Sequence, residues 1–186
     1  MHALILIDIQ TGFDAPVWGT RNNPQAEDRA GDLLAHARAR ACAKDWAIFH
    51  IRHISTTPGS PLSGAGTTFK PQVTPRDGEA VIDKSVNSAF IGTDLETRLR
   101  ERAITDLVIC GLTTPHCVST TTRMAANLGF CVTLAHDACA AFTSNADTTW
   151  ADLPPLDATT IHNTALSHLH GEFASVRAVA DITAHE

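Results

Sequence analysis

The sequence lacks the features that would direct the protein to nucleic acid or into a membrane. Its 186 residues include 14 Lys and Arg against 20 Asp and Glu, and the basic residues are scattered along the chain. A formal charge of −6 without a basic stripe argues against binding to a phosphate backbone. No apolar run is long enough to span a bilayer. The first residues show neither a basic start nor a small-residue cleavage site, so we expect a cytoplasmic protein.

Cysteine is scarce, and its spacing excludes two common kinds of site. The chain has five cysteines and no Cys-x-x-Cys pair, so neither a zinc ribbon nor a thioredoxin-type redox motif is present. In a reducing compartment all five should be free thiols. Four of them lie in apolar segments, where a cysteine is usually a small core residue: Cys42, Cys110, Cys131 and Cys139.

The sequence does contain an alternation of apolar strand-like runs and helical segments. Such an alternation predicts an α/β fold, a three-layer α-β-α sandwich with a central, mostly parallel sheet. No repeat or linker interrupts it, so we expect a single domain over residues 1–186. The predicted strands are residues 3–7, 47–51, 80–82, 107–110, 130–135 and 174–179, and the predicted helices are residues 25–43, 94–102 (with Thr93 as N-cap), 117–128 and 157–170.

Residues 55–78 are the one long irregular segment. They contain four prolines and several glycines, and unstructured segments of this length inside a compact domain are usually functional or disordered. We predict a loop over an active site, although a mobile surface excursion would have the same composition.

Three polar residues come just after predicted buried strands. Asp8 follows the first strand, Lys84 the third, and Cys117 comes after the fourth, where a helix begins. In a parallel sheet, the carboxyl ends of the strands border the ligand crevice, so the three side chains should meet at one edge. Singly, they could be a loop carboxylate, a surface lysine and a core thiol. Together they provide an acid/base, a cation and a nucleophile.

The predicted position of Cys117 at a helix start favours a reactive thiol. The positive end of the helix dipole would lower the thiol pKa, and free N–H groups there can hold a developing oxyanion. Gly111 would allow the backbone to turn out of the preceding strand.

Three motifs resemble the isochorismatase-like hydrolases. Residues 6–13, LIDIQTGF, are similar to the family's Asp-x-Gln-x-x-Phe opening, and residues 84–90, KSVNSAF, are similar to its Lys motif. Residues 111–118, GLTTPHCV, are similar to its Gly-x-x-Thr-x-x-Cys-Val elbow. The three motifs occur in the family's order and at compatible spacings.

This resemblance implies an Asp8–Lys84–Cys117 triad of the kind used by the family's amidases. Cys117 would attack a carbonyl group and form a thioester, Asp8 would move the protons, and Lys84 would stabilise their charged forms. The resemblance also implies a cis peptide bond between Leu112 and Thr113. The oxyanion would bind the N–H groups of Thr113 and Cys117.

The resemblance to the zinc-binding nicotinamidases is incomplete. Those enzymes carry an Asp-x-His pair after the second strand, whereas this chain has Ile51 where the Asp would be and only His53 matches. We therefore expect no metal and no other cofactor. Arg52 and His53 would then be free to bind substrate. The other predicted substrate-binding residues are Phe13, Trp18, Asn87, Phe90 and His116.

The resemblance leaves three functions open. Cleavage of an amide-type C–N bond in a small metabolite is favoured because Cys117 is present with both partners. The alternatives are vinyl ether or ester hydrolysis on the same fold, and a non-catalytic protein that binds ligands or senses oxidants through Cys117. We expect a small-molecule substrate and a homo-oligomer, a dimer or tetramer, with no nucleic acid or membrane partner.

Overall fold

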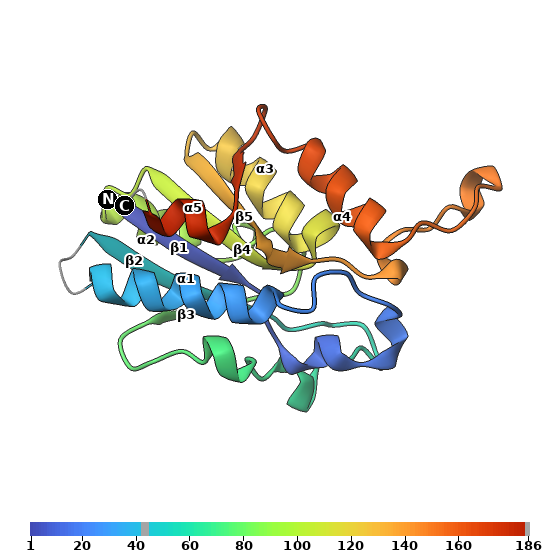
Figure 1. Cartoon of the computed structure of the whole chain (residues 1–186). Helices are drawn as coiled ribbons and strands as arrows, with labels where there is room; N and C mark the ends of the chain where they lie inside the picture. Colours follow the sequence, from blue (N-terminus) through green and yellow to red (C-terminus); the bar gives the residue numbers. More distant parts are fainter. Residues whose placement is uncertain (42–44, 185–186) are drawn as a thin grey trace.

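A parallel sheet lies at the centre of the molecule (Figure 1). The computed structural model describes residues 1–41 and 45–184, and within them six strands pair in the order β3-β2-β1-β4-β5-β6, all parallel. The strands are β1 (His2–Ile7), β2 (Trp46–His53), β3 (Ala80–Lys84), β4 (Asp106–Leu112), β5 (Cys131–Ala140) and β6 (Ser175–Arg177).

Helices cover both faces of this sheet. α1 (Ala26–Ala41) and α5 (Val179–Ala184) lie together on one face, while α3 (Ser119–Asn127) and α4 (Ala158–Ser167) lie on the other (Figure 1). α2 (Leu95–Glu101) connects β3 to β4. In the described part of the chain, no helix has the length and apolar character needed to cross a membrane. The predicted three-layer α/β fold is confirmed.

The order of the strands determines where a ligand can bind. From β1 the chain moves to β2 and β3 on one side, and then returns to β4 on the other side of β1. In open parallel sheets, ligands bind at such a reversal, beyond the carboxyl ends of the strands. β1 ends at Ile7 and β4 at Leu112, so the crevice lies beside Asp8 and the segment after Leu112.

Gly111 allows β1 and β4 to approach each other next to this crevice. Its φ is +128°, and a Cβ atom added there would lie 2.0 Å from the Ile7 carbonyl oxygen. The pairing of β4 with β5 also shifts register between Ile109 and Gly111. Glycine is therefore required inside the strand, not only for a turn after it.

We expect Gly111→Ala to lower the free energy of unfolding by about 3 kcal/mol, because the methyl group meets backbone atoms and the φ is strained. Gly129→Ala is the matched control: its φ is +87°, but an added Cβ meets nothing within 4 Å. That variant should lose only about 1 kcal/mol. If urea unfolding gave the two variants equal losses in the free energy of unfolding, the close approach of β1 and β4 at Gly111 would be contradicted.

Several predicted boundaries are wrong. The segment predicted as a last strand forms only the short β6, and α5 begins at Val179. Asp94, not Thr93, is the N-cap of α2. The segment from residue 55 to 78 contains two 3₁₀ turns, Gly64–Thr67 and Pro71–Val73.

The cysteines predicted to lie in the core differ in burial. Cys110 and Cys139 are buried free thiols, as predicted, whereas Cys131 is exposed because it begins β5 at the edge of the core. Cys42 and the predicted end of the first helix at residue 43 lie outside the described residues.

Candidate active site

Asp8, Lys84 and Cys117 meet at the predicted edge of the sheet. Asp8 directly follows β1 with a φ of +52°, and its N–H donates to the Ile51 carbonyl oxygen at 3.0 Å. Lys84 is the last residue of β3. Cys117 lies in a π-helical turn, Thr114–Val118, that joins β4 to α3.

The Lys84 ammonium group connects the other two side chains. It donates to Asp8 Oδ2 at 2.7 Å and to Cys117 Sγ at 3.3 Å. It also contacts His53 Nδ1 at 3.0 Å and donates to the Val86 carbonyl oxygen at 3.1 Å. The side chains of Asp8 and Lys84 are fully buried, and Cys117 is 8% exposed. A buried cation with several acceptors holds its partners in one geometry.

Burial determines the protonation of this cluster. It raises the pKa of Asp8, although Lys84 acts in the opposite direction. Burial also raises the pKa of the Cys117 thiol to about 12, and the nearby Asp8 carboxylate adds to the rise. The thiol pKa of the resting site is therefore raised, in the direction opposite to the one expected from a helix start, and the causes are burial and the Asp8 charge.

One carboxylate oxygen is available to take the thiol proton. Among the described residues, Asp8 Oδ1 is buried and has no hydrogen-bond partner. A carboxylate oxygen of Asp8 and the Cys117 sulfur lie within 4.8 Å of each other. An acceptor without a partner beside a protonated thiol fits a base that acts only when the nucleophile attacks.

Asp8, His53 and Cys117 also have the spacing of a metal site, since one donor atom from each lies within 4.8 Å of the others. A zinc ion of the nicotinamidase type does not fit here. The Lys84 ammonium group contacts all three side chains, and its charge disfavours a second cation between them. Ile51, where the resemblance would require an aspartate, is fully buried in β2.

The Gln10 side chain positions the backbone of His53. The buried Gln10 amide donates to the His53 carbonyl oxygen at 3.0 Å and accepts the His53 N–H at 2.7 Å. Burial and the Lys84 charge lower the pKa of His53 to about 4. The Nδ1 atom of a neutral imidazole can accept a hydrogen bond from the Lys84 ammonium group, which a protonated ring could not.

The low pKa of His53 predicts a dependence of stability on pH. Its folded pKa of about 4 lies below the ordinary 6.5, so the native state favours the neutral ring. Its contribution is complete above pH 6.5 and is lost as the pH falls toward 4. Over that interval we expect wild type to lose about 2 kcal/mol more than His53→Gln, allowing for partial exposure of the ring. Equal pH slopes in urea-unfolding series would contradict this prediction.

Backbone hydrogen bonds shape the turn that carries the nucleophile. The Thr113 carbonyl oxygen accepts the N–H groups of His116 at 3.1 Å and Val118 at 3.3 Å. The peptide bond between Leu112 and Thr113 is cis. From α4, the buried His162 ring contacts the Thr114 hydroxyl at 2.8 Å. The turn is therefore held by its own backbone hydrogen bonds and by a side chain of α4.

A cavity of about 180 Å³ opens beside Cys117. One wall is aromatic and is formed by Phe13 and Trp18, whose ring centroids lie 5.1 Å apart. Phe142 packs against Phe13 outside the lining, with 5.9 Å between ring centroids. The rest is polar and includes amide, hydroxyl and imidazole groups. The residues predicted to bind substrate that line the cavity are Phe13, Trp18, His53, Asn87 and His116, together with Thr113.

Two predicted substrate-binding residues lie elsewhere. Arg52 forms an ion pair with Asp83 at 2.7 Å, because side chains alternate along β2 and His53 takes the direction of the cavity. Phe90 stacks on Phe130 at 6.1 Å between ring centroids. The structure brings neither to the cavity lining.

Four residues of the lining are not apparent from sequence: Ser55, Ser60, Leu62 and Asn145. The first three belong to the Pro- and Gly-rich segment predicted to cover the site, and that composition was the available signal. Asn145 lies in a 3₁₀ turn, Thr143–Asn145, that no sequence pattern marks.

These features define an α/β protein with a buried carboxylate–ammonium–thiol cluster at the switch point of a parallel sheet. Comparison with known proteins gives the family. The model of the isochorismatase domain matches residues 2–181, so the chain belongs to the isochorismatase family of hydrolases.

Two of the similar proteins match almost the whole chain, and a third matches about three quarters of it. The isochorismatase family protein YrdC of Bacillus subtilis (strain 168) is 47% identical over 94% of this chain and 90% of its own length. The crystal structure of an isochorismatase-family protein from Chromobacterium violaceum ATCC 12472 aligns with a TM-score of 0.89 at 44% identity, over 98% of this chain and 91% of that one. Streptothricin hydrolase of Streptomyces noursei is 32% identical over 76% of this chain and 50% of its own length.

Proposed function

We propose that this protein hydrolyses an amide-type C–N bond of a small molecule, with Cys117 as nucleophile, Asp8 as acid/base and Lys84 as the stabilising cation. The observation that carries the proposal is the buried Lys84 ammonium group, which contacts both Asp8 Oδ2 and Cys117 Sγ. A buried ion pair is seldom favoured for stability alone, so its position beside a thiol in a cavity favours a catalytic role.

In the first half of the reaction, Cys117 Sγ attacks the substrate carbonyl carbon as its proton passes to Asp8 Oδ1. The N–H groups of Thr113 and Cys117 bind the oxyanion of the tetrahedral adduct. Asp8 then gives the proton to the leaving nitrogen as the C–N bond breaks. Ammonia or an amine departs, and a thioester remains on Cys117.

In the second half, water attacks the thioester and its proton passes to Asp8. The C–S bond breaks, the acid product forms, and Asp8 returns the proton to the sulfur. Lys84 stays protonated throughout, so its charge offsets the negative charge on Asp8 in the resting state and on sulfur during attack.

The cavity supports a small, uncharged substrate. A volume of about 180 Å³ lies below the usual range of drug-sized pockets, roughly 300–1,000 Å³. Among the described residues, no arginine or lysine lines it to bind a carboxylate. Lys84 lies outside this lining, and its ammonium group is held by Asp8 and Cys117. The aromatic wall formed by Phe13 and Trp18 suits the flat face of an amide, ureide or lactam.

A screen of product release tests this function. Small neutral amides, ureides and lactams are compared with their carboxylate-bearing analogues, and with esters and vinyl ethers. Ammonia or amine release from the neutral C–N substrates supports the proposal. Turnover confined to esters or vinyl ethers would replace it with one of those two reactions. If folded protein released no product from any compound of the panel, a ligand-binding or thiol-sensing role would be favoured.

A further inference from the structure

A projecting arm between β5 and α4 lies outside the catalytic machinery. We define the arm as residues 146–157; Figure 1 shows this segment, in orange, extending away from the body of the molecule. Every residue from 149 to 157 is exposed. Trp150 at the tip is 81% exposed and Leu153 is 50% exposed. Large apolar side chains gathered on a projection are costly in water unless another surface covers them.

The tip of the arm is ordered by its own hydrogen bonds. The Leu153 N–H donates to the Thr148 carbonyl oxygen at 3.3 Å, and the Thr148 hydroxyl donates to the Leu153 carbonyl oxygen at 3.1 Å. Asp147 accepts from the Thr149 N–H at 2.9 Å. A tip closed in this way holds the backbone that carries Trp150, so less backbone entropy is lost when the tip binds.

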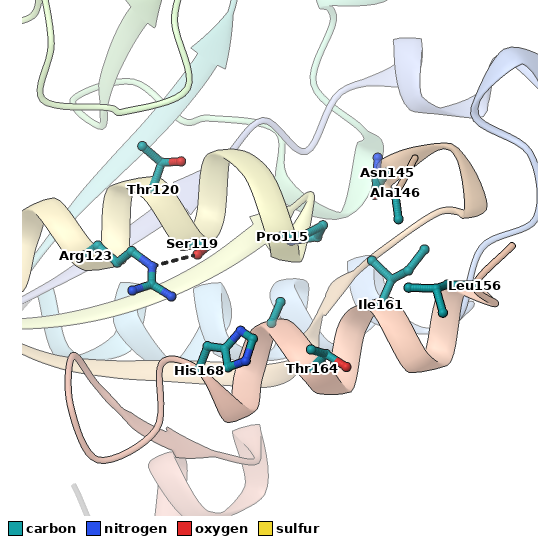
Figure 2. Close-up of a pocket in the computed structure, with 11 residues that line it drawn as sticks. Pro115, Ser119, Thr120, Arg123, Asn145, Ala146, Leu156, Ile161, Thr164 and His168 are labelled. Atoms are coloured by element: carbon teal, nitrogen blue, oxygen red, sulfur yellow. Dashed lines mark hydrogen bonds between the residues drawn. The ribbon is translucent and has the colours of Figure 1, made fainter. Parts of the chain in front are cut away.

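A groove of about 510 Å³ lies between α3 and α4, at the base of the arm. Figure 2 shows its lining: Pro115 and Arg123 on one side, Ile161 and His168 on the other, and Leu156 at one end. This groove is larger than the catalytic cavity and contains no catalytic residue. Its walls combine apolar side chains with the Arg123 guanidinium group and the His168 imidazole ring.

The arm and the groove are complementary. The arm carries three aspartates, Asp147, Asp152 and Asp157, and no basic residue. The titratable side chains of the groove are Arg123 and His168. The apolar tip matches the apolar part of the groove, and the acidic flanks match its basic part. The base of the arm contributes Ala146 and Leu156 to the groove of its own chain. Its tip extends away from α4 and the body of the molecule (Figure 1), where a different molecule can meet it.

We propose that the arm of one copy docks into the α3–α4 groove of a second copy, with Trp150 as the anchor. Because each chain carries both an arm and a groove, a two-fold axis satisfies both contacts at once. Exposed tryptophans that enter a partner's pocket contribute strongly to binding. The contact concerns assembly and stands whether or not the proposed amidase reaction is correct.

Sedimentation analysis of three variants tests the docking. Trp150→Ser removes the anchor, Thr164→Trp fills the groove, and Ile91→Ser is the control, because Ile91 is another exposed apolar residue, 51% exposed, outside both surfaces. Wild type and the control should have the mass of at least two chains. Each of the other two variants should fall to a lower assembly state while keeping its circular dichroism spectrum. Ala165→Trp fills the same groove if Thr164→Trp does not fold.

Mixing the two defective variants tests whether the arm of one chain enters the groove of another. The Trp150→Ser protein keeps an intact groove and the Thr164→Trp protein keeps an intact arm, so an equimolar mixture regains one good contact per pair. We expect larger species to reappear in the mixture, with a blue shift of Trp150 fluorescence. A monomeric wild type, variants with unchanged mass, or a mixture that stays dissociated would each overturn the proposal.

Discussion

Asp8→Asn should lower turnover by about a thousandfold and at the same time make the Cys117 thiol easier to ionise. The amide cannot accept the thiol proton or activate water, so both halves of the reaction fail. The negative charge of Asp8 contributes to the raised thiol pKa of about 12, and Lys84 remains beside the sulfur, so the thiol pKa should fall in the variant.

The two readouts separate a base from a merely structural carboxylate. Turnover is measured on the best substrate of the screen, and the alkylation rate of the Cys117 peptide is followed against pH by mass spectrometry. Asp83→Asn, at an exposed acid of β3, is the control and should change neither. If Asp8→Asn left the thiol pKa unchanged or higher, the charge of Asp8 would not contribute to the raised pKa of the resting thiol.

Lys84→Met should lower both stability and activity. Removing the ammonium group leaves the buried Asp8 carboxylate without its partner, which costs about 3–5 kcal/mol of the free energy of unfolding. Arg52→Met removes an exposed partner of Asp83 and should cost less than about 1 kcal/mol. Both are read from urea unfolding monitored by circular dichroism.

A double variant distinguishes the electrostatic account from a loss of packing. Asp8→Asn combined with Lys84→Met removes both buried charges, so stability should return to within about 1–2 kcal/mol of wild type. Turnover should stay absent, because neither the base nor the cation is present. A double variant as unstable as Lys84→Met would show that shape, not charge, was the main loss.

Much of this site could be predicted from sequence because its residues end strands. Asp8 follows β1 and Lys84 ends β3, and strand ends meet at one edge of a parallel sheet. The cavity-facing position of His53 was also predictable. The alternation of side chains along a strand then excludes its neighbour Arg52 from the same face, a signal that the sequence prediction did not apply.

Other features depend on tertiary structure that local patterns do not encode. The raised pKa of Cys117 follows from burial by segments far apart in the chain, whereas the sequence indicated only a helix start. The segment from residue 146 to 157 has the composition of an ordinary loop, and only the structure shows it as a projecting arm. Phe90 is the last residue of the Lys motif, which begins at the sheet edge, but its ring stacks on Phe130.

Comparing Cys117→Ala with Cys131→Ala tests the central claim most directly. Both variants remove one thiol, but Cys131 is exposed at the start of β5 and lies outside the cavity lining. With the best C–N substrate of the screen, wild type and Cys131→Ala should release product at equal rates. Folded Cys117→Ala should release none above the uncatalysed background. Turnover in Cys117→Ala close to that of wild type would contradict a thioester mechanism and the triad built on it.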